Sequence, residues 1–178
     1  MRKVILFIAS SLDGYIAGPK GEIDWLFSDQ DYGYAEFFAG VDTVVMGRLT
    51  YEVSLSFGEY PYPRREGFVF SRTKSGTRDA NVSFVGEEPG PFVRKLKKRA
   101  GKKIWLVGGA GIIQSCMSHD VIDEYVISIH PVILGSSIPL FRGSMPTTPL
   151  KLQNTRTFET GLAQLTYVRP LTPDTRSG

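Results

Sequence analysis

The sequence has few of the residues on which disulfide-linked and zinc-binding proteins depend. Its 178 residues include one cysteine and two histidines. Because Cys116 is alone, no disulfide can form within the chain, and no zinc site can be built on cysteines. His119 and His130 alone make a poor metal set, so we expect no bound metal. A single thiol fits a reducing compartment, and we expect a cytoplasmic protein.

Long hydrophobic runs and a large excess of charge are also missing. No segment approaches the roughly 20 apolar residues that a membrane helix needs, so no membrane partner is expected. The apolar run at residues 4–9 is short for a signal peptide, and Asp13-Gly14 follows it, so we interpret it as a first strand. The net charge of +3 is too small to imply nucleic acid and suits an anionic small ligand equally well.

One dense basic segment, RKLKKRAGKK, begins at Arg94. Phe92, Val93 and Leu96 give this segment an apolar stripe. No aromatic residues alternate with its cations, as a surface that stacks on bases would require. We therefore expect a solvated helix face and no nucleic-acid partner. Nucleic-acid binding through this segment is the third of three functional hypotheses.

Strand-like and helix-like segments alternate through most of the chain. Several strand segments are nearly continuous apolar runs, which suit a sheet covered on both faces. The predicted strands cover residues 4–9, 43–46, 67–70, 82–85, 103–107 and 125–130. The predicted helices cover residues 34–39, 50–57, 91–100 and 110–117. This alternation predicts an α/β sandwich of three layers, with much parallel pairing in its central sheet.

The last part of the chain has a different pattern. Segments 151–158 and 162–168 are separated by Glu159-Thr160-Gly161 and predict an antiparallel hairpin at the sheet edge, so the sheet should be mixed. We expect one domain over residues 1–170 and a disordered polar tail at 171–178. The segment from 11 to 32 has little periodicity, and loops of that length are uncommon unless they cover a site.

One predicted strand ends in a glycine-rich turn. In KIWLVGGAGII, an apolar strand meets Gly108-Gly109, then Gly111 and the start of a helix. Glycines allow positive φ and close approach of a ligand, and the first N–H groups of a helix favour an anion, above all a phosphate. A tight turn that needs glycine only for its shape is the alternative. The spacing is not GxGxxG, so an ordinary Rossmann fingerprint is disfavoured.

Two more predicted strands end in groups that suit a phosphate. In VVMGRLTYE, Gly47 ends the strand, so Arg48 emerges at the carboxyl edge of the sheet. Thr50 can cap the next helix, donate to a phosphate, or do both, and a plain surface role for Arg48 is the alternative. In GFVFSRT, Ser71 and Arg72 follow the strand. Because ligands of open α/β sheets bind beyond the carboxyl ends of strands, the three ends together predict an extended polyphosphate ligand.

Taken in order, these segments resemble a known superfamily. SLDGYIAG, VVMGRLTYE, FVFSR, IWLVGGAGI and DEYVISIHPVILGSSIPLF follow one another along the chain. The set resembles the dihydrofolate reductase-like superfamily, and it is closest to the branch containing the C-terminal reductase domain of bacterial riboflavin biosynthesis proteins. The resemblance covers residues 3–169. It implies a mixed central sheet flanked by helices, NADPH as cofactor, and a homodimer.

The resemblance also implies roles for particular residues toward NADPH. Ala9 and Ile16 would lie near the nicotinamide. Ser71 and Arg72 would receive the adenosine 2′-phosphate, where a bidentate cation suits a dianion. The residues meeting the phosphates would be Gly47, Arg48 and Thr50. The residues cradling the pyrophosphate would be Gly108, Gly109, Ala110, Gly111 and Ile112. Reductases of this superfamily carry a cis peptide at the paired glycines, so one is expected between Gly108 and Gly109.

The substrate side carries weaker signals. Dihydrofolate reductases hold a carboxylate on the first helix that assists protonation of the pterin. Counting back from Gly47 puts Asp31 near that place, and an acidic loop is the alternative reading of Asp31. Asp13, in SLDG, either binds substrate or closes a turn. Trp25 either lines the pocket or anchors its loop in the core.

Two functional hypotheses rank above nucleic-acid binding. The first is an NADPH-dependent reductase that transfers a hydride to a small pterin-like or ribosylamino-pyrimidine-like heterocycle. The second is a non-catalytic protein that binds a nucleotide or heterocycle on the same fold, since no proton donor is obvious. One departure bears on the substrate, because the riboflavin reductase normally follows a zinc-dependent deaminase domain that this sequence does not contain. The phosphate pocket for a ribosylamino-pyrimidine is therefore left open.

Overall fold

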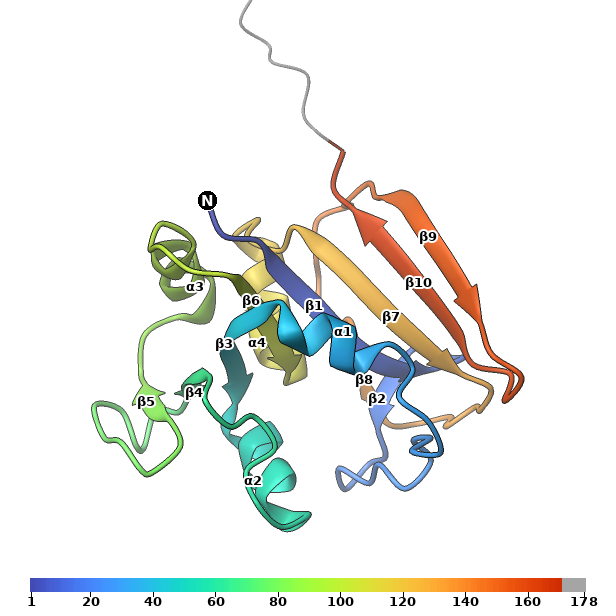
Figure 1. Cartoon of the computed structure of the whole chain (residues 1–178), viewed down its shortest axis with the longest axis horizontal. Coiled ribbons are helices and arrows are strands. Elements are labelled where there is room, and N and C mark those ends of the chain that lie inside the picture. The colour runs from blue at the N-terminus through green and yellow to red at the C-terminus, as the bar shows by residue number, and fades with distance from the viewer. Residues whose placement is uncertain (171–178) are drawn as a thin grey trace, which may run out of the picture.

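The fold is built on a mixed eight-stranded sheet with helices on both faces (Figure 1). The computed structural model describes residues 1–170, so the tail predicted at 171–178 lies outside the described residues. In chain order the strands of this sheet are β1 (Val4–Ser11), β3 (Val41–Gly47), β4 (Glu66–Phe70), β5 (Ser83–Val85), β6 (Lys103–Gly108), β7 (Glu124–His130), β9 (Lys151–Thr157) and β10 (Ala163–Val168). The helices are α1 (Tyr34–Ala39), α2 (Arg48–Ser56), α3 (Pro89–Lys97) and α4 (Ala110–Ser118).

Most neighbouring strands of the sheet are parallel. In space the order is β5-β4-β3-β6-β1-β7-β10-β9. Every pair from β5 to β7 is parallel, whereas β10 is antiparallel to both β7 and β9. Parallel strands need long crossover connections, and α2, α3 and α4 lie in those from β3 to β4, from β5 to β6 and from β6 to β7. The predicted α/β class, the mixed sheet and the C-terminal hairpin are therefore confirmed.

Alternate residues of the central strands face two separate cores. In β6, Ile104 and Leu106 belong to the core that α3 and α4 cover, whereas Trp105 belongs to the core that α1 covers. Figure 1 shows α1 crossing one face of the sheet and α4 lying on the opposite face. Burial on both faces explains why these strands appear in the sequence as continuous apolar runs.

An aromatic cluster holds α1 against the sheet. Trp105 is 6% exposed, and its ring lies with centroid distances of 5.3–6.2 Å from those of Phe7, Tyr34, Phe37 and Phe38. The indole Nε1 of Trp105 donates to the carbonyl oxygen of Phe7 at 2.9 Å. A six-residue helix is too short to be stable alone, so this packing fixes the position of α1.

Several elements differ from the prediction. A small antiparallel sheet of β2 (Tyr15–Ala17) and β8 (Ile138–Pro139) was not predicted, because strands of two or three residues show no periodicity. Helix α3 begins at Pro89, where the missing N–H of proline suits the first turn, rather than at residue 91. Among residues 1–170, no helix has the length and apolar character that crossing a membrane requires.

Candidate functional site

The ends of β3, β4 and β6 meet at one edge of the sheet. Gly47, the last residue of β3, is paired with Phe70 of β4, and its neighbour Met46 is paired with Gly108 of β6. The residues that follow these three strand ends therefore leave the sheet next to one another. They are Arg48 after β3, Ser71 after β4 and Gly109 after β6. We call this place the strand-end gap.

Glycine at two positions keeps the strand-end gap open. A Cβ atom on Gly109 would lie 3.5 Å from the backbone nitrogen and Cα of Gly47, and 3.3 Å from Cγ1 of Ile112. Gly109 has a φ of +99° and Gly108 a φ of +153°. The described residues contain no cis peptide bond, so the one expected between Gly108 and Gly109 is wrong. The chain turns here through positive φ angles, which glycine adopts without a steric penalty.

Two helices begin at the strand-end gap. Helix α2 starts directly after Gly47 and α4 directly after Gly109, and neither helix has a side-chain cap. Their first N–H groups lie at the positive ends of the helix dipoles and suit an anion. The prediction that Thr50 could cap α2 is wrong, because the extended Gly47 is the N-cap and Thr50 lies within the first turn. The Thr50 hydroxyl instead lies 4.0 Å from the place of a Cβ on Gly108.

Two of the predicted cations lie beside the strand-end gap. Arg48 is exposed and pairs with Glu52 at 2.7 Å, a surface pair of the kind that contributes little stability. Arg72 is exposed and takes part in none of the ion pairs within residues 1–170. Ser71 is 7% exposed, and its N–H donates to the carbonyl oxygen of Val85 at 2.9 Å. This bond fixes the start of the loop that carries Arg72.

Arg142 is a third cation at this edge, and the sequence did not reveal it. Its Nη2 atom lies 3.9 Å from the place of a Cβ on Gly111, in the first turn of α4. Arg142 is exposed, and the ion pairs of the described chain do not include it. A cation beside the positive end of a helix is unfavourable unless an anion lies nearby. The residue sits in a long loop without periodicity, so no local pattern marked it.

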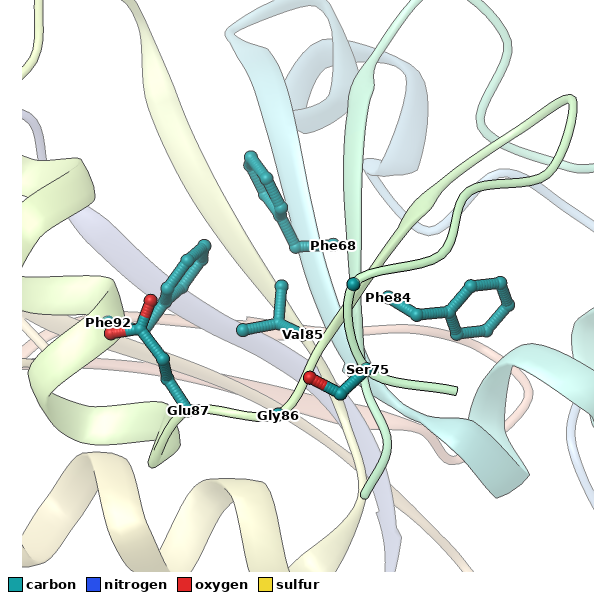
Figure 2. Close-up of a pocket in the computed structure, with 8 residues that line it drawn as sticks. Phe68, Ser75, Phe84, Val85, Gly86, Glu87 and Phe92 are labelled. Atoms are coloured by element: carbon teal, nitrogen blue, oxygen red, sulfur yellow. The ribbon is translucent and has the colours of Figure 1, made fainter. Parts of the chain in front are cut away.

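A cleft of about 410 Å³ lies beyond the carboxyl end of β5. Figure 2 shows Phe68, Val85 and Phe92 on one side of it, whereas the ring of Phe84 points away. Ser75 and Glu87 add polar groups to the lining. Because β5 is bonded to Ser71, this cleft adjoins the loop of Arg72. Its apolar surface and polar rim suit one face of a flat base.

A second cavity, which we call the aromatic pocket, lies on the α1 face of the sheet and has a volume of about 290 Å³. Its lining includes four rings, those of Phe7, Phe27, Tyr32 and Tyr34, and the polar side chains of Gln30, Asp31, Ser128 and His130. Ala9 also lines the pocket and is paired with Ser128 of β7. The preceding residue, Ile8, faces the other way, with Cδ1 3.4 Å from the place of a Cβ on Gly108. β1 therefore contacts the aromatic pocket through Ala9 and the strand-end gap through Ile8.

His130 links the aromatic pocket to the loop that covers it. His130 is 4% exposed, and its Nε2 accepts a hydrogen bond from the N–H of Phe27 at 3.2 Å. The proton therefore belongs on Nδ1, which lies 3.2 Å from the carbonyl oxygen of Ser128. Burial lowers the pKa of His130, and the bond to the Ser128 carbonyl offsets part of this effect. The rings of Trp25 and Phe27 pack on the imidazole, so a neutral His130 fastens residues 25–27 to β7.

Comparison with known proteins assigns this architecture to a family. The family model described as the RibD C-terminal domain matches residues 2–164. The chain belongs to the RibD C-terminal domain family. It is 42% identical over 172 residues to the uncharacterized protein YwjB of Bacillus subtilis, and the match covers 94% of this chain and 98% of YwjB.

Solved structures agree with this assignment of the RibD-type domain. A protein of Shewanella sp. PV-4 that is named for riboflavin biosynthesis superposes with a TM-score of 0.83 and 31% identity, covering 95% of this chain and 99% of that one. A Thermotoga maritima diaminohydroxyphosphoribosylaminopyrimidine deaminase/5-amino-6-(5-phosphoribosylamino)uracil reductase superposes with a TM-score of 0.71 at 16% identity. That match covers 95% of this chain and 57% of the larger protein, and it shows the fold alone. The predicted family and fold are confirmed.

The predicted substrate-side acids of this RibD-type domain have structural partners. Asp31 lines the aromatic pocket, and its Oδ1 accepts a hydrogen bond from the N–H of Ala35 at 3.0 Å at the start of α1. Asp13 accepts hydrogen bonds from the Ser11 hydroxyl and from two backbone N–H groups of residues 134 and 135. The Ser11 bond is the main cause that lowers the pKa of Asp13. These bonds favour the turn-closing reading of Asp13.

Neither Trp25 nor Ile16 lines the aromatic pocket. Trp25 packs edge-on against His130 with ring centroids 5.2 Å apart, and its Nε1 donates to the carbonyl oxygen of Glu22 at 3.3 Å. It therefore lies behind the lining of the aromatic pocket and anchors its loop. Ile16 packs against the core on the α3 and α4 face of the sheet, the face opposite the aromatic pocket.

Sequence reasoning missed the polar residues of β7. In DEYVISIH, Ser128 and His130 occupy alternate positions of an otherwise apolar strand, so both point to one face. That alternation was the available signal. Gln164 of β10, directly opposite Ser128, donates to the Ser128 hydroxyl at 3.0 Å and to the carbonyl oxygen of Tyr32 at 3.2 Å.

The basic segment from Arg94 is largely paired within the chain. Lys97 is buried and bonds both carboxylate oxygens of Asp123 at 2.7 Å. Lys95 pairs with a glutamate side chain, Arg99 pairs with Glu66, and Arg94 donates to a backbone carbonyl. The exposed cations fit the expected solvated helix face, but that expectation is wrong for Lys97, which is buried against Asp123.

The pH dependence of stability should report on His130. Its pKa lies below the ordinary 6.5 in the folded chain, so the unfolded chain binds the proton more tightly. The stabilisation by neutral His130 is complete above pH 6.5 and is lost as the pH falls through and below this value. We expect urea unfolding to show a smaller loss of stability on acidification for His130→Gln than for the wild type.

His119→Gln is the matched control, since it removes the other histidine. This variant should lose as much stability on acidification as the wild type. Equal pH dependence in His130→Gln and the wild type would contradict the assigned hydrogen bonds of His130.

Proposed function

We propose that this RibD-type domain is an NADPH-dependent reductase that transfers a hydride to a small pterin-like or ribosylamino-pyrimidine-like heterocycle. The observation that carries the proposal is the strand-end gap, where three strand ends, two uncapped helices and several arginines come together. Membership of a family with a reductase fold supports it.

The residues at the strand-end gap fit a pyrophosphate group. A Cβ atom on Gly109 would fill the space next to Gly47, so glycine leaves room for a ligand there. The N–H groups at the starts of α2 and α4 would donate to phosphate oxygens from two sides. The residues we assign to this role are Gly47, Arg48, Thr50, Gly108, Gly109, Ala110, Gly111 and Ile112. Arg142 joins them because of its position next to Gly111.

The 2′-phosphate that distinguishes NADPH from NADH would bind at the end of β4. Ser71 is held in place by its bond to β5, and the exposed Arg72 can offer a bidentate guanidinium to a dianion. The adenine would then lie in the neighbouring cleft of Figure 2.

The reacting groups would meet at the end of β1. When bound, NADPH supplies the hydride. We assign Ala9 to the nicotinamide, since it lies near the end of β1 and lines the aromatic pocket. Ile16 is assigned to the nicotinamide by the resemblance alone, because it packs on the opposite face of the sheet. The aromatic pocket would hold the substrate ring and exclude water, with Asp13 and Trp25 fixing the surrounding loops. Asp31 is the candidate proton carrier, because one of its oxygens remains available beside the pocket.

Binding of NADPH is the direct test of this function. The full chain is titrated with NADPH, and quenching of tryptophan fluorescence with energy transfer to the dihydronicotinamide is recorded. We expect saturable binding in the micromolar range. The proposal fails if no binding occurs at millimolar NADPH.

A non-catalytic binding protein on the same fold is the second candidate. It is favoured by the structural use of Asp13 and the capping bond of Asp31, which leave few groups free to move a proton. NADPH that binds but is not oxidised with any pterin, flavin precursor or quinone would favour this candidate. We also infer a cytoplasmic location, because the buried Cys116 suits a reducing compartment.

The outer strand of the sheet suggests a homodimer. β9 is the last strand of the sheet, and all seven of its residues are exposed. Such an edge is open to pairing, and a second copy of the chain is the partner we propose. Light scattering should give twice the 19.8 kDa mass of one chain. Leu152→Lys on β9 should reduce the dimer, whereas Leu55→Lys on α2 should not. A wild-type monomer at micromolar concentration would reject the dimer.

Cofactor preference should separate the roles of two arginines. We expect Arg72→Ala to raise the Kd for NADPH by about tenfold or more, as expected for loss of a charged hydrogen bond, and to change the Kd for NADH by less than about twofold. Arg142→Gln should weaken both cofactors by a similar factor, because the pyrophosphate is common to both. Fluorescence titration with each cofactor measures these effects.

The control variant is Arg99→Ala, which removes an exposed guanidinium at the opposite end of β4. Equal losses of NADPH and NADH affinity in Arg72→Ala would contradict the 2′-phosphate role.

A further inference from the structure

The aromatic pocket has no positive charge in its lining. None of its lining residues is lysine or arginine. His130 is the only other group there that could become a cation. Both of its ring nitrogens are already used, Nδ1 as a donor and Nε2 as an acceptor, which requires the neutral form. A phosphate on the substrate would therefore find no cationic partner in this pocket.

The loop at the mouth of the pocket carries negative charge instead. Asp31 lines the pocket directly. Asp29 precedes it by two residues and accepts a hydrogen bond from the hydroxyl of Tyr32, another lining residue, at 2.6 Å. This bond is the main cause that lowers the pKa of Asp29, so its carboxylate is ionised at neutral pH. Two carboxylates near the entrance would repel an approaching phosphate dianion.

Two arginines lie near the aromatic pocket but outside its lining. Arg156 of β9 lies over the ring of Phe158 at 5.4 Å, next to Gly33, and is not part of the lining. Arg65 donates to the carbonyl oxygen of Phe38 at 3.2 Å and lies 4.2 Å over the Phe38 ring, so it is held at the end of α1 outside the lining. Burial raises the pKa of Tyr34, and the charge of Arg65 offsets part of this rise. Arg156 is therefore the side chain that a phosphorylated ligand would have to recruit.

The size and walls of the pocket favour a flat ring. Its volume of about 290 Å³ is at the low end for ligand sites. The rings of Phe7 and Tyr34 are held by stacking on two further rings of α1, with centroid distances of 4.2 and 5.3 Å. Rings fixed in this way offer edges and faces against which a planar heterocycle can pack.

We propose that the substrate of this RibD-type domain is a planar heterocycle of one or two rings that carries no phosphate and is neutral or cationic. This inference rests on the reductase function proposed above. It sets the chain apart from the Thermotoga maritima protein, whose name specifies a phosphoribosylamino-uracil.

A matched pair of ligands tests the proposal. Calorimetry on the full chain saturated with NADP+ compares 6-ribitylaminouracil with its 5′-phosphate. We expect the unphosphorylated ligand to bind at least about tenfold more tightly. Asp31→Asn keeps an oxygen for the Ala35 N–H and should reduce this preference about threefold or more, mainly through tighter binding of the phosphate. Glu36→Gln, on the exposed face of α1, is the control and should leave the preference unchanged.

Each other outcome is decisive. Equal or tighter binding of the phosphorylated ligand, above all if Arg156→Gln abolishes it, overturns the proposal and leaves the reductase function standing. If the chain binds NADP+ but neither of the two ligands, the proposal is also overturned, because the pocket then does not accept this class of ring. An unchanged preference in Asp31→Asn overturns the electrostatic explanation. Failure of NADPH itself to bind overturns the reductase function, and the substrate proposal with it.

Discussion

The close approach of β3 and β6 at their carboxyl ends is the constraint on which the site depends. Gly47 and Gly109 lie close together, so a Cβ on Gly109 would contact the Gly47 backbone at 3.5 Å, and the φ of +99° at Gly109 disfavours any side chain there. Because both residues also precede helices, their contact directs two helix N-termini toward the same space. Parallel pairing brings the end of β4 to the same edge. The proposed anion site thus depends on strand register, and the arginines would add to the positive potential of the two helix N-termini.

The order of the strands places the proposed cofactor site and the proposed substrate site on either side of β1. β1 lies between β6 and β7, so it borders the strand-end gap on one side and the polar residues of β7 on the other. Successive residues of a strand point to opposite faces, and Ile8 and Ala9 therefore contact different regions. A cofactor above the end of β6 and a substrate on the α1 face could meet only where β1 ends. His130 contributes by fastening the covering loop to the sheet.

Much of the fold followed from the sequence because burial on both faces makes the central strands unmistakable. The segments around Val45 and Leu106 have no polar alternation, and their glycine ends marked the turns correctly. The three strand ends could be grouped because parallel strands share one carboxyl edge. The cap at Gly47 could not be predicted, since it depends on local φ and ψ angles that glycine leaves free. The cis peptide expected after Gly108 came from the resemblance alone, and the structure has the ordinary trans form there.

The aromatic pocket was harder to predict for a physical reason. It forms where the loop before α1 folds over β7, and this contact joins residues about 100 positions apart, as in the bond of Phe27 to His130. Arg142 likewise reaches α4 from a loop without periodicity. Such contacts arise from tertiary packing. The sequence signals of the two acids were ambiguous, since Asp13 fitted substrate binding or a turn, and Asp31 fitted a catalytic role or an acidic loop.

A crystal structure of the chain with NADPH bound tests the central claim most directly. The account predicts that the pyrophosphate oxygens lie within hydrogen-bonding distance of the N–H groups at the starts of α2 and α4, with the 2′-phosphate on Ser71 and Arg72. A dinucleotide bound at the amino edge of the sheet, or anywhere that leaves the space between Gly47 and Gly109 to solvent, would contradict it.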